Sequence, residues 1–157
     1  MKILYICTHN RCRSILSEAI TNHLANGRFQ AFSAGSQPAG QVHPLSLKYL
    51  DEKGISTESL TSQSWDDFEA ERPDIVVTVC DSAASEACPV WFGDTTKVHW
   101  GLPDPSKLKG SETEIRDAFF AVMATIEQRI QKLLGCGLEK LSKNERQQVL
   151  NSLIGES

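Results

Sequence analysis

Residues 75–79 form a run of β-branched side chains, Ile-Val-Val-Thr-Val, that has no polar face. A strand of this kind is buried on both sides, as in parallel sheets that helices cover on both faces. Shorter strand candidates lie at 2–6, 29–32 and 95–100, and segments with the apolar spacing of helices separate them. This alternation predicts an α/β fold, a three-layer sandwich with a ligand crevice at the carboxyl ends of the strands.

Two capping boxes mark helices in the last third of the chain. Ser111 is followed three residues later by Glu114, and apolar residues then recur at helical intervals. Ser142 and Glu145 repeat the pattern closer to the C-terminus. The two patterns predict a long amphipathic helix and a short terminal helix.

Length and charge limit the classes of function. A chain of 157 residues corresponds to about one domain, and we expect a single domain over 1–157 in which 138–157 are a C-terminal helical extension. The net charge is −4 and no segment gathers enough Lys and Arg to bind a phosphate backbone, so we expect no nucleic-acid partner. The apolar start at 1–6 ends too early for an export signal or a membrane span. We therefore expect a cytoplasmic protein that does not bind membranes.

The cysteine content points to chemistry rather than to structural crosslinks. The sequence has five cysteines, an odd number, and no export signal. Thiols in the cytoplasm normally stay reduced. We expect reactive thiols among these five.

The loop between the first strand and the first predicted helix carries the most informative motif. Five residues separate Cys7 from Arg13, and Ser14 follows. A loop of this length can curl so that its N–H groups and the helix N-terminus converge on a tetrahedral oxyanion, to which Arg13 adds a two-pronged donor. The same field stabilises a thiolate, and Ser14 is placed to donate to the sulfur. We therefore predict a pKa for Cys7 below the usual value of about 8.5, and a nucleophile beneath the bound oxyanion. The expected oxyanion-binding residues are Thr8, His9, Asn10, Arg11, Cys12, Arg13 and Ser14.

Together with Ser33-Ala34-Gly35 and Asp104-Pro105, this loop resembles the low-molecular-weight protein tyrosine phosphatase superfamily, and more narrowly its arsenate reductase branch. The resemblance covers about residues 2–134. It implies a four-stranded parallel sheet flanked by helices, with the loop as the oxyanion site. In the resemblance, Asn10 matches an Asn that supports the loop, and Ser33 matches a Ser that hydrogen-bonds that Asn.

Asp104 is the candidate general acid. It lies on a short loop bracketed by prolines after the fourth strand candidate, from which it can reach over the crevice. Phosphatases of the family carry tyrosines beside this acid, which stack on an aromatic substrate. Leu102, Pro103 and Ser106 stand there in this sequence, so a phosphotyrosine platform is not evident.

Cys80 and Cys88 favour a reductase. Cys80 ends the 75–79 strand candidate, at the sheet edge where Cys7 also lies, and Cys88 follows after a segment rich in Ala and Ser. Arsenic(V) bound to a thiolate is reduced only when a second thiol attacks that thiolate sulfur. The two cysteines match the redox pair of thioredoxin-linked reductases, with a separation one residue longer than in the best-known pattern.

The resemblance thus implies a reaction sequence for arsenate. Cys7 attacks arsenate while Asp104 protonates the departing hydroxide. Cys80 attacks the Cys7 sulfur and releases arsenite, and Cys88 then takes over the disulfide. Thioredoxin, glutaredoxin or glutathione is the expected external reductant.

Two other functions remain open on the sequence. A phosphatase would use Cys7, Arg13 and Asp104 on a phosphate monoester, with Cys80 as an inert core thiol. A module without catalytic activity would hold an oxyanion or arsenite for a partner protein. The histidines have no ligand spacing with the cysteines, and we expect no bound metal and no cofactor.

Overall fold

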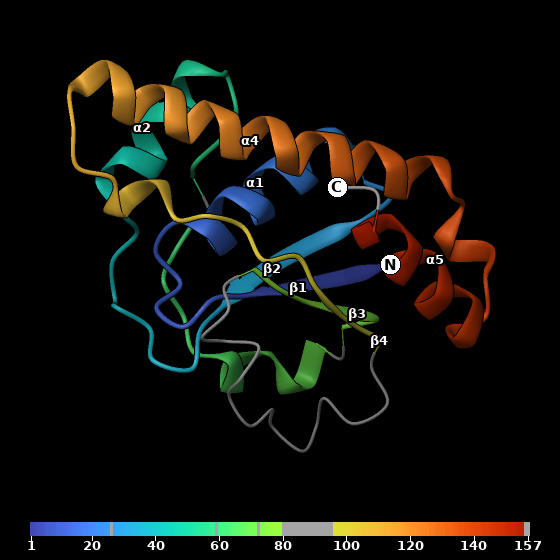
Figure 1. Ribbon diagram of the computed structural model, residues 1–157. Helices are drawn as coiled ribbons and strands as arrows, with labels where there is room; N and C mark the ends of the chain where they lie inside the picture. Colours follow the sequence, from blue (N-terminus) through green and yellow to red (C-terminus); the bar gives the residue numbers. More distant parts are fainter. Residues whose placement is uncertain (26, 59, 72, 80–95, 156–157) are drawn as a thin grey trace.

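The described part of the chain forms one sheet of four parallel strands. The computed structural model describes residues 1–25, 27–58, 60–71, 73–79 and 96–155. The strands run in the spatial order β2-β1-β3-β4 (Figure 1). Their bounds are β1 (Lys2–Ile6), β2 (Gln30–Ala34), β3 (Ile75–Thr78) and β4 (Thr96–His99). The four-stranded parallel sheet predicted from the sequence is confirmed.

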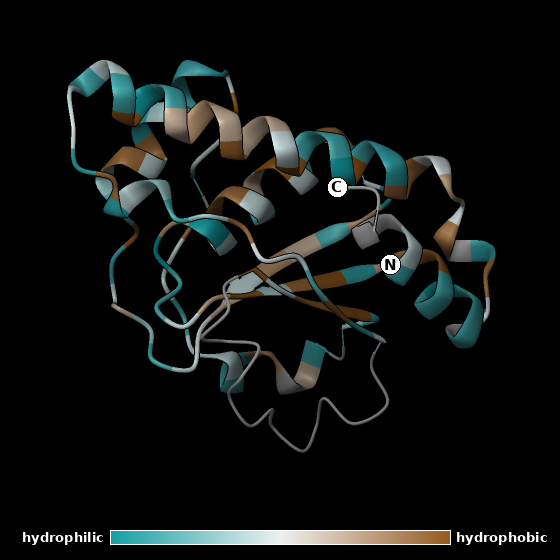
Figure 2. Ribbon diagram, in the orientation of Figure 1, coloured by the Kyte–Doolittle hydropathy of each residue, from teal (hydrophilic) through white to brown (hydrophobic). Residues whose placement is uncertain are grey.

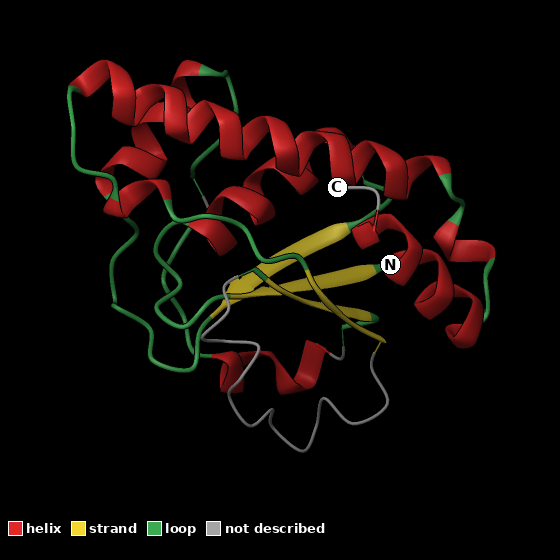
Figure 3. Cartoon of the chain, viewed as in Figure 1, coloured by secondary structure: helices red, strands yellow, loops and turns green. Residues whose placement is uncertain are grey.

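Helices cover both faces of this sheet and one of its edges. Helix α1 lies between the sheet and the long helix α4, and the short helix η1 lies on the opposite face (Figures 1 and 3). Helix α5 packs along β4. The helix bounds are α1 (Arg13–Ala25), α2 (Pro44–Glu52), η1 (Trp65–Glu71), η3 (Pro105–Lys107), α4 (Glu112–Gly135), η4 (Leu138–Lys140) and α5 (Lys143–Gly155).

Burial of apolar side chains explains the inner strands. In β3, Ile75, Val76 and Val77 are each at most 2% exposed, as a strand covered on both faces requires. Figure 2 shows the same hydrophobic character along β1. Val79 is also buried, so the predicted burial is confirmed at these four residues, whereas Thr78 is only half-buried.

Both predicted capping boxes are present. The Ser111 hydroxyl accepts a hydrogen bond from Glu114 N at 3.1 Å, and the Glu114 carboxylate accepts one from Ser111 N. Ser142 and Glu145 make the same reciprocal pair ahead of α5. These bonds satisfy N–H groups that have no partner inside the helix.

Helix α5 also bonds to the backbone of the edge strand β4. The Gln147 amide accepts from Lys97 N at 3.3 Å and donates to Lys97 O at 2.9 Å. One side chain thus occupies the donor and the acceptor that a neighbouring strand would take.

Two features differ from the sequence prediction. Strand β2 ends at Ala34 instead of residue 32, because Ser33 and Ala34 pair with the last two residues of β1. Helix η1 was not predicted. The Ser64 hydroxyl accepts from Asp66 N at 3.2 Å and starts this helix, a local cap that the sequence analysis did not use.

The strand register aligns the ends of the strands at the site. Ile6 pairs with Ala34 on one side and Thr78 on the other, and Thr78 pairs with His99. Cys7 follows directly and donates from its N–H to Ala34 O at 3.2 Å. The loop after β1 therefore starts at the carboxyl edge of the sheet.

Gly35 lets the end of β2 approach this loop. A Cβ atom at position 35 would lie 2.4 Å from Thr8 O and 2.6 Å from Cys7 O, and both neighbours are backbone atoms. Gly35 also donates to Gln63 O at 2.9 Å and accepts from Trp65 N at 3.1 Å. Glycine is the only residue that fits this position without displacing the loop.

Gly35→Ala is expected to lower the free energy of unfolding by about 1–3 kcal/mol and to weaken phosphate binding, because the loop carbonyls must move. Urea unfolding and calorimetric titration with phosphate measure the two effects. Gly135→Ala is the matched control, since a Cβ there meets no atom within 4 Å. Equal stability and phosphate affinity in both variants would contradict the steric argument.

Glu18 is an acidic side chain on the buried face of α1. It is 6% exposed, and its Oε1 accepts a hydrogen bond from Ser33 Oγ at 2.5 Å. Burial raises the pKa of Glu18 to about 7, and the bond from Ser33 offsets part of this rise. The carboxyl group therefore changes charge near neutral pH inside the layer between α1 and β2.

This raised pKa predicts that stability falls as the pH rises. An unfolded Glu titrates near pH 4.3, whereas Glu18 in the folded protein holds its proton up to about pH 7. Between these values the folded state binds more protons, so the contribution of Glu18 is complete below the lower value and lost above the upper one. Glu18→Gln keeps an acceptor for Ser33 and cannot ionise. It is expected to remove roughly 2–3 kcal/mol of pH dependence across this window.

Urea unfolding at several pH values between about 5 and 8 measures this change in slope. Glu112→Gln serves as the control, because the Glu112 side chain is 83% exposed. Identical slopes for Glu18→Gln and the unaltered protein would show that Glu18 does not hold its proton in the folded state.

Candidate active site

A cavity of about 150 Å³ lies at the end of β1. Its lining residues come from the loop after β1 and from the loop after β4, and they are Cys7, Thr8, His9, Arg11, Cys12, Arg13, Asp104, Ser106 and Lys107. The structure thus brings Cys7, Arg13 and Asp104 together, as the sequence analysis expected of a nucleophile, an anion ligand and an acid. Asn10 and Ser14 do not line the cavity.

Asn10 instead holds the loop from behind. It is fully buried and has a φ of 48°, the left-handed region that Asn tolerates better than most residues. Its Nδ2 donates to Ser14 Oγ at 2.8 Å, and its Oδ1 accepts from Gln63 N at 2.7 Å. The side chain therefore ties the bend of the loop to the first turn of α1 and to residue 63.

The expected hydrogen bond between Ser33 and Asn10 is replaced by other bonds. Ser33 Oγ donates to Glu18, and Gln63 occupies the connecting position. Gln63 donates from its backbone to Asn10 and from Nε2 to Ser33 O at 3.4 Å. Sequence reasoning missed Gln63, because its contacts depend on how the segment after α2 folds back.

The carbonyl groups of the loop bond away from the cavity. Thr8 O accepts from Gln37 N at 2.9 Å, and His9 O accepts from Ala39 N at 2.9 Å. Neither donor lines the cavity. These bonds fix the loop backbone. They also engage two carbonyl oxygens, which carry partial negative charge, with donors outside the cavity.

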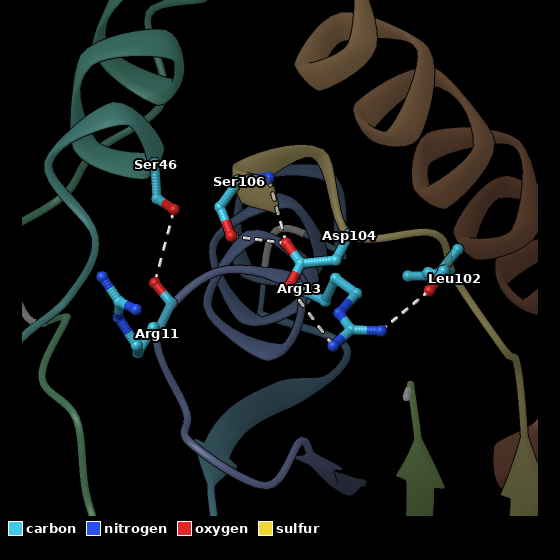
Figure 4. A network of polar contacts seen from close by, with 6 residues as sticks. All are labelled: Arg11, Arg13, Ser46, Leu102, Asp104 and Ser106. Carbon is cyan, nitrogen blue, oxygen red and sulfur yellow. Dashed lines mark hydrogen bonds and ion pairs between the residues drawn. The ribbon is translucent and has the colours of Figure 1, made fainter. Parts of the chain in front are cut away.

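Helix α2 holds the next part of the loop. Arg11 O accepts from His43 N at 3.0 Å. It also accepts from Ser46 Oγ at 3.3 Å (Figure 4). His43 is the N-cap of α2, and its ring accepts from Leu45 N. Burial, together with the positive charge of Arg11, lowers the pKa of His43. The His43 ring therefore favours its neutral form near Arg11, which lines the cavity.

Arg13 and Asp104 face each other across the cavity wall (Figure 4). Arg13 Nη1 donates to Leu102 O at 3.1 Å, and Nη2 lies 3.5 Å from Asp104 Oδ2. Arg13 Nε is buried and has no hydrogen-bond partner within the described part of the chain. A buried donor without a partner is costly, and an oxyanion in the cavity would supply the missing acceptor.

Cys12 is a second thiol in the cavity wall. It is 4% exposed, and burial raises its pKa to about 12. The negative charge of Asp104 adds to this rise, whereas a hydrogen bond with Ser46 opposes it. Cys12 is therefore a neutral packing residue at physiological pH.

Cys80 and Cys88 lie outside the described residues, so their roles stay predictions.

Lys107 lines the cavity, although the sequence analysis did not select it. Its position three residues after Asp104 is the signal that would have found it.

Neither a metal cluster nor a membrane helix is found in the ranges given above. No group of three or more His, Cys, Asp or Glu side chains there is placed to hold a metal ion. No helix among these residues is both long and apolar enough to cross a membrane.

Comparisons with known proteins agree with this arrangement. The family model of low molecular weight phosphotyrosine protein phosphatase matches residues 2–148. The arsenate reductase of Halalkalibacterium halodurans is 33% identical over 135 residues, which cover 86% of this chain and 96% of that protein.

Solved structures show the same similarity. An arsenate reductase in the phosphate binding state superposes with a TM-score of 0.71 at 25% identity, over 85% of this chain and 96% of that one. The thioredoxin-dependent arsenate reductase of Corynebacterium glutamicum has a TM-score of 0.60 at 27% identity, over 83% of this chain and 61% of that one. The chain therefore belongs to the low molecular weight phosphotyrosine protein phosphatase family, as its sequence predicted, and within that family it is similar to arsenate reductases.

Proposed function

We propose that this protein is an enzyme that reduces arsenate to arsenite, with Cys7 as its nucleophile. The observation that carries the proposal is the buried Nε of Arg13, which has no partner among the described residues. The Arg13 side chain lines the same small cavity as Cys7. A tetrahedral oxyanion fits a cavity of about 150 Å³ and supplies the acceptor that this donor requires. The similarity to proteins named arsenate reductases supports arsenate as the oxyanion.

Binding of arsenate would use the N–H groups of the loop, the N-terminus of α1 and the guanidinium of Arg13. Arg11 and Lys107 add positive charge at the cavity wall. The same field favours the thiolate of Cys7. Phosphate has the same shape and charge, and one similar structure is an arsenate reductase in its phosphate binding state.

The first chemical step would join Cys7 to arsenic. The thiolate forms a sulfur–arsenic bond, an arsenic–oxygen bond breaks, and a proton from Asp104 converts the departing hydroxide to water. Asp104 lines the cavity with Cys7, which supports its role as the acid.

The reduction would follow from a second thiol. Cys80 attacks the Cys7 sulfur, the bonding electron pair passes to arsenic, and arsenite leaves as a Cys7–Cys80 disulfide forms. Cys88 then attacks the Cys80 sulfur, the Cys7–Cys80 bond breaks, a Cys80–Cys88 disulfide forms and Cys7 leaves as a thiolate. These two roles rest on the sequence match, because both residues lie outside the described ranges.

An external thiol would close the cycle. A thioredoxin-type protein is favoured over glutaredoxin or glutathione, because the sequence carries a second resolving cysteine and one similar structure is a thioredoxin-dependent enzyme. A cycle of this kind needs a reducing compartment, which favours the cytoplasm. The cycle needs no further cofactor.

Cys80→Ser is expected to abolish multiple turnovers of arsenate while leaving hydrolysis of p-nitrophenyl phosphate largely intact, since only the reduction needs a second thiol. Cys7→Ser is expected to abolish both activities. Arsenite production with a thioredoxin system, measured beside p-nitrophenol release, separates the two reactions. Cys136→Ser is the control, because the half-buried Cys136 lies at the end of α4, away from the cavity.

The results also distinguish the competing functions. Phosphate ester hydrolysis without arsenate turnover would identify a phosphatase. Oxyanion binding without either reaction would identify a binding module. Full arsenate turnover by Cys80→Ser would remove Cys80 from the mechanism.

A single turnover of arsenate without reductant is expected to end in a Cys80–Cys88 disulfide. Mass-spectrometric mapping of the thiols after rapid alkylation measures this product. A stable Cys7–Cys80 disulfide would contradict the role of Cys88 and would favour a glutathione or glutaredoxin partner.

A further inference from the structure

We infer that Ser106 is a positioning residue that holds Oδ1 of Asp104 and so assigns the reacting proton to Oδ2. The inference rests on the proposed function in one respect, that Asp104 is the acid of the reaction. It adds a residue for which neither the motif nor the comparisons provide a role.

Ser106 makes two hydrogen bonds to one oxygen of Asp104. Its backbone N donates to Oδ1 at 3.0 Å, and its hydroxyl donates to the same atom at 2.5 Å (Figure 4). A carboxyl oxygen that already accepts two donated hydrogen bonds has little capacity for a proton of its own. The proton of a neutral Asp104 is therefore held on Oδ2.

The other carboxyl oxygen of Asp104, Oδ2, faces the guanidinium of Arg13. Oδ2 lies 3.5 Å from Nη2 of Arg13, and both side chains are only about one-sixth exposed, at 16% and 15%. An oxyanion in the cavity competes with Oδ2 for this guanidinium. Binding of the oxyanion therefore frees Oδ2, while Ser106 keeps Oδ1 in place.

The local backbone makes this arrangement rigid. Asp104 caps the short helix η3, whose first residue is the buried Pro105 with its restricted φ. The bond from Ser106 N belongs to this cap and would exist with many residues at position 106. The hydroxyl bond is the contribution that serine adds.

This difference allows a selective test. Ser106→Ala removes the hydroxyl bond and keeps the backbone bond, whereas Ser106→Thr keeps a hydroxyl. With the hydroxyl bond lost, the carboxyl group rotates more freely and presents its proton correctly for a smaller share of the time. Because Ser106 does not bind the oxyanion in this scheme, phosphate affinity should not change.

The experiment measures steady-state arsenate reduction with a thioredoxin system. Ser106→Ala is expected to lower kcat about tenfold with KM within about twofold of the unaltered protein, and Ser106→Thr is expected to restore most of kcat. Phosphate dissociation constants are expected to be equal in all three proteins. Ser111→Ala, which removes the N-cap of α4 at a residue that does not line the cavity, is the control and is expected to leave kcat unchanged.

A second measurement reports on the proton itself. Phenyl phosphate has a leaving group that needs protonation more than that of p-nitrophenyl phosphate, so the loss in Ser106→Ala is expected to be several-fold larger for phenyl phosphate. A merely structural defect would lower both rates by the same factor.

The two measurements separate the inference from the proposed function. Absence of arsenate reduction with intact ester hydrolysis would overturn the proposed function, and the leaving-group comparison would still decide the role of Ser106. An unchanged kcat in Ser106→Ala, or an equal loss with both esters, would overturn the inference. An unaltered protein that turns over neither arsenate nor either ester would refute both.

Discussion

The bend in the loop between β1 and α1 depends on one buried side chain. Asn10 adopts a left-handed backbone conformation that costs free energy, and its two hydrogen bonds, to Ser14 and Gln63, offset that cost. Gly35 provides the second requirement, a place where β2 can approach the same loop without a side chain. The cavity exists because these two constraints, one polar and one steric, act on neighbouring parts of the loop.

The contacts of the Arg13 guanidinium can be exchanged for contacts with an anion. Arg13 bonds to Leu102 O and Asp104 while its Nε stays without a described partner. The guanidinium is thus held in position by weak or replaceable contacts and can turn its donors to an anion at little cost. Burial meanwhile raises the pKa of Cys12 and keeps that thiol neutral.

The parts of this protein that were predictable from sequence are those encoded by local patterns. The buried strand β3, the capping box of Ser111 and the spacing of Cys7 and Arg13 each depend on residues close together in the chain. Lys107 lies only three residues after Asp104 and was overlooked, whereas Gln63 was missed because its role arises from contacts with distant segments. The exact end of β2 was missed for the same reason, since pairing with β1 draws Ser33 into the sheet.

The amide of Gln147 affects whether another copy of this molecule can pair with the edge strand β4. An outer strand with unoccupied backbone groups invites another chain to add a strand and so begins aggregation. On β4 the groups of Lys97 are already saturated by a side chain that a helix carries. Addition of a further strand beside β4 therefore requires α5 to detach first, so α5 protects this edge against aggregation.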